Sequence, residues 1–341
     1  MAGAGLVDFQ VHYTPAALNR RTEASVLLDA RGNPCYFLNP LLSQPDAHLA
    51  VMDAAGIDAM VLSCGAGFDQ PDIGICRLIN DDIAGLVRAH PGRFIGLAHV
   101  PALDPVAAAA ELKRCRLELD FPGVVIGSEL QGRGLDDAAL EPFWRACQEL
   151  DLYVFVHPLP AVINWDRMDA DDLGRMVGWE FSLMVATLRV IQSGLLDRFP
   201  DLRIQFSHFS GGIGRYLGRL RGFAQHEKWG TAGLPRHGRA PARPMDYYLE
   251  QRLFYDCAGW AGPDNAAAWG AEWVRFGLAE VAPSQVVFAT DYPQAVRAAD
   301  EVAAYVGAVR ALGPAARQML GDAVATRLIP DLARRVRRPE H

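Results

Sequence analysis

Short apolar runs, rich in β-branched and aromatic residues, alternate with longer stretches of helical periodicity along most of the chain. The runs with the length and composition of a strand are 6–12, 57–62, 94–99, 123–127, 152–157, 202–208, 252–256 and 285–290. The clearest helical pattern is 136–150, where apolar residues recur at the helical spacing behind Asp136 and Asp137. The pattern therefore predicts eight strands, each followed by a helix.

Strand–helix units repeated in this way are typical of a parallel sheet with right-handed crossovers. A closed (β/α)8 barrel, the TIM barrel of the α/β class, accommodates eight such units most simply. An open, doubly wound sheet of eight strands is the alternative. We expect a single barrel over 1–330 and a basic C-terminal tail over 331–341, which includes the exposed end of a helix.

Two stretches interrupt the repeat with clusters of proline and glycine. They are 20–45, after the first strand, and 225–247, before the seventh strand, and the second is also rich in arginine. Long loops in a compact domain are often lids or subunit contacts, so we expect insertions here. We assign 225–247 as the contact of a homodimer, and a solvated surface loop is the alternative.

Composition restricts the class of protein. The chain of 341 residues has 33 Lys and Arg against 40 Asp and Glu, a formal net charge of −7, which argues against nucleic-acid and anionic-membrane partners. Six cysteines with no CxxC pair indicate a reduced compartment. The sequence shows neither a signal-peptide pattern nor an apolar run of transmembrane length. We expect a soluble, cytoplasmic protein.

Polar residues that can bind a metal stand at the ends of four predicted strands. His12 ends the first strand, His157 the fifth and His208 the sixth, and the eighth runs directly into Asp291. The carboxyl ends of the strands form the catalytic face of a (β/α)8 barrel, so these four side chains should converge. Any one of these histidines alone would more often be structural, but four at the same end of different strands favour a site.

The alternation of side chains along a strand gives the orientation of the first one. Gln10 and His12 should share the face that points into the barrel, and Val7, Phe9 and Val11 should point to the helices. His99 also ends a strand, but we assign it a structural role.

Imidazole nitrogens together with a carboxylate are a usual ligand set for one catalytic divalent metal. Such an ion would lower the pKa of bound water or polarise a substrate oxygen. Neutral imidazoles bind it, so activity should fall below about pH 6.

These residues lie in segments that resemble the amidohydrolase-related family typified by aminocarboxymuconate-semialdehyde decarboxylase, which includes the γ-resorcylate and 5-carboxyvanillate decarboxylases. The matching pieces span nearly the whole chain in the family's order. They are VDFQVHYTP at the start, MDAAGIDAMVLS at 52–63, GVVIGSELQGRGLDD at 123–137, LYVFVHP at 152–158, GLLDRFPDLRIQFSHFSGG at 194–212, LFYDCAG at 253–259, VVFATDYP at 286–293 and GDAVATRLI at 321–329.

The resemblance implies a (β/α)8 barrel with one metal ion and assigns roles to individual residues. His12 is the second histidine of the family's HxH motif, His157 the ligand of the fifth strand, and Asp291 the carboxylate ligand of the eighth. His208 becomes the acid–base residue beside the metal-bound water, and Asp291 shares this catalytic role. A helix start near Arg215 or Arg219 would receive a substrate carboxylate, and Trp165 and Trp179 would form a wall for an aromatic ring.

Gln10 is a departure from the family pattern, because its position holds His in many members and Glu in some. A neutral amide is a weak ligand or none, so we expect His12, His157 and Asp291 to hold the ion. We expect one divalent ion, Zn²⁺ or Mn²⁺, with Mg²⁺ less favoured, and the oxygen donors shift the balance from Zn²⁺ towards Mn²⁺.

Three functions follow from this set of residues. The first is a lyase that decarboxylates a small aromatic or unsaturated carboxylic acid without oxidation, using Asp291 or His208 for the proton. The second is a hydrolase of a lactone, ester or amide, or a hydratase, on the same barrel. The third is a metal-free, repurposed paralogue, suggested by Gln10.

Overall fold

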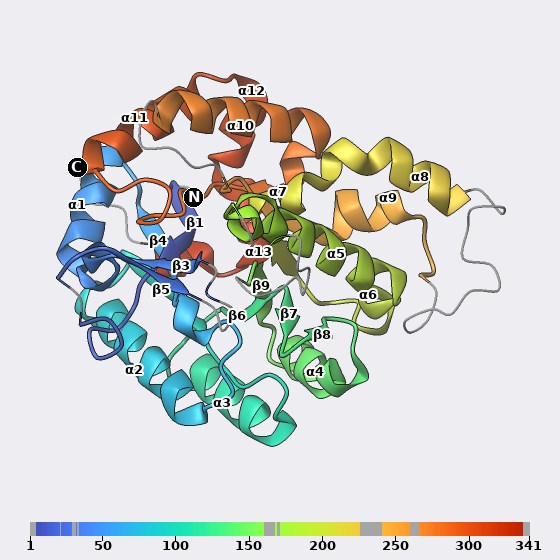
Figure 1. Cartoon of the computed structure of the whole chain (residues 1–341), viewed down its shortest axis with the longest axis horizontal. Helices are drawn as coiled ribbons and strands as arrows, with labels where there is room; N and C mark the ends of the chain where they lie inside the picture. Colours follow the sequence, from blue (N-terminus) through green and yellow to red (C-terminus); the bar gives the residue numbers. More distant parts are fainter. Residues whose placement is uncertain are drawn as a thin grey trace.

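The structure is a computed structural model, and it describes residues 5–20, 22–28, 32, 34–159, 168, 171–225, 241–259 and 266–336. Its centre is an eight-stranded parallel sheet with the order β1-β4-β5-β6-β9-β10-β11-β12. The helices form a ring around these strands (Figure 1). This arrangement confirms the predicted (β/α)8 barrel, and a match to the amidohydrolase family, reported below, agrees with it.

All eight predicted strands are present, with small differences at their ends. They are β1 (Val7–His12), β4 (Ala59–Ser63), β5 (Phe94–Ala98), β6 (Gly123–Gly127), β9 (Tyr153–His157), β10 (Ile204–Phe206), β11 (Leu253–Asp256) and β12 (Val286–Val287). Their residues are buried throughout, as expected of parallel strands covered on both faces.

The two ends of the sheet meet, so the barrel is closed and the open sheet is excluded. The amide of Phe9 donates to the carbonyl of Phe288 at 2.9 Å, and the amide of His12 donates to the carbonyl of Tyr292 at 2.8 Å. In the reverse direction the amide of Asp291 donates to the carbonyl of Gln10 at 3.0 Å. This seam joins β1 to the segment that follows β12.

The helices of the described residues follow the strands in sequence. The longer ones are α1 (Pro45–Ala55), α2 (Ile73–Ala89), α3 (Pro105–Leu117), α4 (Glu141–Glu149), α5 (Trp179–Gln192), α8 (Leu217–Gln225), α10 (Ala266–Glu280) and α11 (Ala299–Arg310). The shorter ones are α6 (Leu195–Arg198), α7 (His208–Gly212), α9 (Met245–Tyr247), α12 (Pro314–Met319), α13 (Asp322–Leu328) and α14 (Leu332–Arg335). The predicted helix over 136–150 is a 3-10 turn, Ala138–Leu140, that continues into α4.

A β-bulge in β1 corrects the predicted orientation of this strand. Its pairing with β4 shifts by one residue between Asp8 and Val11. Val7 and Phe9 pack in the cluster that fills the barrel, whereas Val11 packs in the outer cluster with the helices. The prediction that Val7 and Phe9 face the helices was therefore wrong, because the extra residue reverses the alternation.

The N-terminal end of the barrel is closed by the last described residues. Leu328, Leu332 and Val336 are buried in the same cluster as Val7 and Phe9. The guanidinium of Arg335 bonds to both Asp331 (2.8 Å) and Asp120 (3.0 Å). In the segment 331–341, Leu332 and Val336 are buried, because an open barrel end would leave apolar side chains in water, whereas the side chain of Arg334 is 59% exposed.

The first insertion forms a small hairpin near the carboxyl ends of the strands. Strands β2 (Ser25–Leu28) and β3 (Pro34–Leu38) pair in antiparallel fashion. The side-chain amide of Gln294 donates to the carbonyl of Phe37 at 2.9 Å, so the hairpin is attached to the loop after β12. Most of the second predicted insertion, 226–240, lies outside the described residues.

Candidate active site

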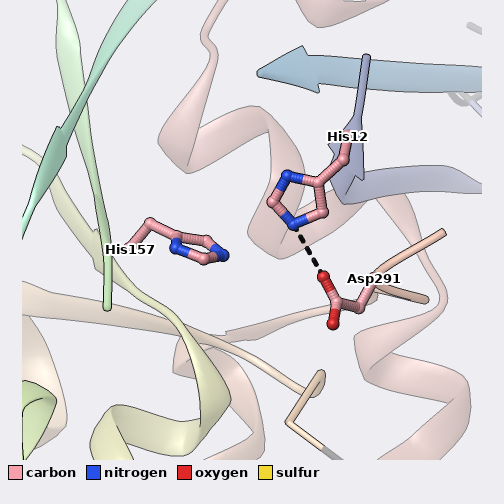
Figure 2. Close-up of side chains that lie close together, drawn as sticks. All are labelled: His12, His157 and Asp291. Carbon is pink, nitrogen blue, oxygen red and sulfur yellow. Dashed lines mark hydrogen bonds and ion pairs between the residues drawn. The ribbon is translucent and has the colours of Figure 1, made fainter. Parts of the chain in front are cut away.

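Three of the residues predicted at strand ends form one cluster at the mouth of the barrel. His12 ends β1, His157 ends β9, and Asp291 follows β12. One donor atom from each lies within 4.8 Å of the others. The Nε2 atom of His12 is 2.8 Å from Oδ1 of Asp291, and the ring of His157 lies across from this pair (Figure 2). The strands thus bring together residues that the sequence keeps far apart.

The protonation states of two members suit metal binding. Burial lowers the pKa of His157 well below its usual value, and the neighbouring His12 adds to this effect. Burial alone would raise the pKa of Asp291, but its hydrogen bond and charge interaction with His12 hold it below its usual value. A neutral imidazole and an ionised carboxylate therefore face the same point.

The donor set fits a divalent cation. The Nδ1–H of His157 donates to the carbonyl of Pro158 at 2.8 Å. This hydrogen bond fixes the ring and leaves the lone pair of Nε2 free to bind a cation. The side chain of Gln10 is fully buried, and its Oε1 has no hydrogen-bond partner among the described residues. The amide nitrogen of Gln10 donates to Asp291 Oδ1 at 3.0 Å, so the nitrogen, and not the oxygen, faces this carboxylate.

His208 lies beside the cluster, and its surroundings shift its pKa in the opposite direction to that of His157. Its Nδ1 lies 2.8 Å from Oε1 of Glu180, and its Nε2 lies 3.3 Å from the amide nitrogen of Gln10. Burial alone would lower the pKa of His208, but the Glu180 carboxylate, with smaller contributions from Asp291 and Asp256, raises it to about 9. The imidazole therefore holds an extra proton at neutral pH.

A small cavity of about 50 Å³ opens over these residues. Its polar part consists of His12, His157, His208, Asp291 and Gln294, and its apolar part of Phe37, Gly65, Phe68, Pro158 and Trp179. The ring of Phe68 lies 4.4 Å from the ring of His157, centroid to centroid. The indole nitrogen of Trp179 is buried and has no partner among the described residues. The cavity thus places apolar side chains and the indole N–H of Trp179 next to His12, His157 and Asp291.

Other residues singled out by the sequence lie elsewhere. Arg215 is not among the residues that line this cavity, because its side chain is 81% exposed and pairs with Glu280 at 3.2 Å. Trp165 falls outside the described residues. His99 is buried and accepts from the amide of Cys64 at 2.9 Å, and burial lowers its pKa to about 3, which agrees with the structural role assigned to it.

The model of the family described as amidohydrolase matches residues 7–329. The chain belongs to the amidohydrolase family.

The similar proteins include several decarboxylases and a 2-keto-4-carboxy-3-hexenedioate hydratase of Sphingobium sp., which is 26% identical over 197 residues and covers 52% of this chain and 54% of that protein. The 2-amino-3-carboxymuconate-6-semialdehyde decarboxylase of Dictyostelium discoideum is 34% identical over 182 residues, which cover 52% of this chain and 50% of the relative. This chain therefore matches about half the length of that relative. The γ-resorcylate decarboxylase of Rhodococcus jostii (strain RHA1) is 31% identical over 272 residues, which cover 74% of this chain and 78% of the relative.

A solved amidohydrolase structure shows the same fold with a metal. It is a 5-carboxyvanillate decarboxylase from Novosphingobium aromaticivorans, a mutant form with bound manganese and 3-methoxy-4-hydroxy-5-nitrobenzoic acid. Its TM-score to this chain is 0.68, with 28% sequence identity, and the match covers 80% of this chain and 76% of that one. These neighbours support a divalent metal in an amidohydrolase of this kind.

Sequence reasoning missed the residues that surround the predicted ones. Glu180 lies near the start of α5, and nothing in the sequence around it identifies His208, in the turn after β10, as its partner. Phe68 and Gln294 are ordinary loop residues until the barrel places them over the cluster. Gly211 and Gly212 were a visible signal of the unusual backbone after β10. His208, Phe209 and Ser210 have positive φ, and the same conformation continues into these two glycines.

Proposed function

We propose that this amidohydrolase catalyses the non-oxidative decarboxylation of a small aromatic or unsaturated carboxylic acid. The observation that supports it best is the metal-binding cluster of His12, His157 and Asp291 beside His208, under a cavity with aromatic walls. The decarboxylase relatives and the bound aromatic acid of the solved neighbour support the same substrate class.

The residues would divide the work as follows. His12, His157 and Asp291 would hold the ion, which would supply positive charge for the carboxylate or a neighbouring hydroxyl of the substrate. When the C–CO2 bond breaks, its electron pair stays on the substrate carbon, and that carbon must accept a proton. His208 would donate this proton from Nε2, because its Nδ1 is engaged by Glu180. Asp291 is the alternative donor.

The cavity wall supports binding of a flat ring with an oxygen substituent. Phe68 would lie along one side of the ring, where it already packs on His157. The buried indole N–H of Trp179 would donate to an oxygen of the substrate, since an unused buried donor is costly without a partner. Of the two tryptophans expected to form this wall, Trp179 lines the cavity.

Three further properties belong to this proposal. We infer Mn²⁺ as the ion, because a solved neighbour contains manganese and Asp291 supplies an oxygen donor. We infer a cytoplasmic protein, since Cys64, Cys76, Cys115, Cys147 and Cys257 are buried and free. We also infer a homodimer, with 225–247 as the contact. Within the described residues, no helix combines the length and the apolarity needed to cross a bilayer.

The test is a product analysis on a panel of hydroxybenzoates and carboxymuconate-like acids with manganese-loaded enzyme. We expect release of CO2 from at least one acid and incorporation of one deuteron from D2O at the carbon that loses it. The matched control is the His208→Asn variant, which should abolish turnover. Hydrolysis or hydration of a panel member without CO2, with label from 18O-water in the product, would instead favour the second chemistry.

A further inference from the structure

We propose that Glu180 is a positioning residue for the proposed reaction, which holds the His208 ring so that Nε2, and not Nδ1, faces the substrate. This inference rests on the proposed function for the chemical role of His208. It rests on the structure for the placement of the ring. The residue was not indicated by any motif, and it comes from α5, whereas His208 follows β10.

The hydrogen bond between the two side chains selects one arrangement of the ring. A carboxylate can only accept, so the Nδ1 atom that lies 2.8 Å from Glu180 Oε1 must carry a hydrogen. This holds whether the ring is neutral or protonated. The nitrogen that gains and loses a proton is therefore Nε2, which is the nitrogen on the side of Gln10 and Asp291.

The backbone of α5 supports this contact. Residues His208–Gly212 form a left-handed turn, which is unfavourable for the three residues that have a Cβ. A Cβ on Gly211 would overlap the backbone carbonyl of Glu180, so the turn and the start of α5 are in direct backbone contact. Further along α5, the hydroxyl of Thr187 forms a hydrogen bond with the hydroxyl of Ser210. Helix α5 thus holds the turn at two places.

The ring of His208 is also confined on its other sides. A Cβ on Gly259 would lie 2.6 Å from Cγ of His208, so the backbone after β11 packs on the ring. The amide of His208 donates to Oδ1 of Asp256 at 3.0 Å. A ring enclosed in this way can still flip by rotation about its second side-chain torsion, which would exchange the places of Nδ1 and Cδ2. The carboxylate of Glu180 is the contact that opposes this flip.

A line of polar contacts links α5 to the cluster of His12, His157 and Asp291. The Nδ1–H of His208 donates to Glu180 Oε1 at 2.8 Å, and the amide nitrogen of Gln10 donates to Asp291 Oδ1 at 3.0 Å. The Gln10 nitrogen can only donate, so its 3.3 Å contact with Nε2 of His208 is a hydrogen bond only when Nε2 carries no proton. This contact therefore stabilises the His208 ring after Nε2 has given up its proton.

The experiment compares Glu180→Leu, Glu180→Gln and the control Glu272→Gln, a helical glutamate that pairs with Arg275 on the surface. The readouts are kcat and KM of the manganese enzyme and the ring 15N chemical shifts of His208 in the zinc-loaded enzyme, assigned with His208→Asn. For Glu180→Leu we expect kcat to fall by about 100-fold or more and KM to change by less than about 3-fold. The ring shifts should show a mixture of the two neutral tautomers.

Glu180→Gln keeps an acceptor oxygen, so it should keep the tautomer and recover at least about 10-fold of the lost kcat. Unchanged ring shifts and unchanged kcat in Glu180→Leu would overturn the proposal. If Glu180→Leu does not fold, the kcat of Glu180→Gln tests the proposal instead. This kcat should fall measurably while KM stays at the parent value, and Glu272→Gln should match the parent in both. An unchanged kcat in Glu180→Gln would overturn the proposal. The ring shifts need no substrate, so they decide the role of Glu180 even if no acid releases CO2 and the proposed function fails.

Discussion

The side chains of His12 and Asp291 lie 2.8 Å apart although 279 positions separate them in the sequence. Their contact keeps Asp291 ionised in a buried site, because the imidazole compensates for the loss of water around the carboxylate. A cation that binds between them and His157 would meet a carboxylate that is already charged. The charge of this carboxylate therefore favours cation binding at the cluster.

Replacing the carboxylate should remove the metal. Asp291→Asn keeps the shape of the side chain and the positive φ of 58° that Asn tolerates, but it removes the charge. We expect the metal content after purification to fall from about one ion per chain to a small fraction of it, and kcat to fall by about 100-fold or more. Elemental analysis and CO2 release measure the two effects. Asp53→Asn, an exposed Asp paired with Arg93, should change neither.

Restoring an imidazole at position 10 should strengthen metal binding. Gln10→His would exchange a weak amide donor for a nitrogen ligand, so we expect the Kd for Mn²⁺ to fall by about 10-fold or more. Competition with a fluorescent chelator gives this value. An unchanged Kd would mean that the side chain at position 10 does not line the metal site. Because the amide contact with His208 is lost, kcat should not rise with the tighter binding.

The indole of Trp179 should determine which acids bind. Trp179→Phe removes the N–H and keeps an aromatic wall, so a single hydrogen bond worth about 1 to 2 kcal/mol is lost. We expect kcat/KM to fall by about 10-fold for acids with a hydroxyl beside the carboxylate and by less than about 3-fold for acids without it. Equal losses for both groups would contradict a role for the N–H in recognition.

The buried carboxyl of Asp8 should make the stability depend on pH. Burial raises its pKa to about 7, against the hydrogen bonds from Thr290, whereas in the unfolded chain it is about 3.9. Between pH 4 and 7 the folded chain keeps a proton that the unfolded chain has lost. The free energy of unfolding should therefore decrease as the pH rises through this range, by up to about 1.4 kcal/mol per pH unit from this group.

The variant Asp8→Asn removes this contribution. Relative to the parent protein, it should gain about 2 kcal/mol in free energy of unfolding when the pH is raised from 5 to 7.5. Urea unfolding with a chelator present at both pH values measures the difference, and Asp53→Asn serves as the exposed control. A difference between Asp8→Asn and the parent that stays constant with pH would show that Asp8 is ionised throughout.

The sequence predicted the barrel well because its signals are local. Each strand is a short apolar run, and each polar residue at a strand end, such as His157, is visible without knowing its neighbours. The bulge in β1 was not predictable, since Phe9 and Gln10 show ordinary alternation and only the pairing with β4 reveals the extra residue. Glu180 was missed for a related reason. Its role depends on a contact between α5 and the turn after β10, and such contacts leave no periodic pattern.

The backbone seam between β1 and the segment after β12 adjoins the cluster of His12, His157 and Asp291. His12 and Asp291 belong to this cluster, and their backbones also form hydrogen bonds of the seam. A bound ion would fasten the first strand of the barrel to the last one. At a free metal concentration 100 times its Kd, such a fastener adds about 2.7 kcal/mol to the free energy of unfolding. Metal binding and closure of the barrel would then favour each other. An ion held by residues of both segments would stabilise the seam, and its removal would take this contribution away.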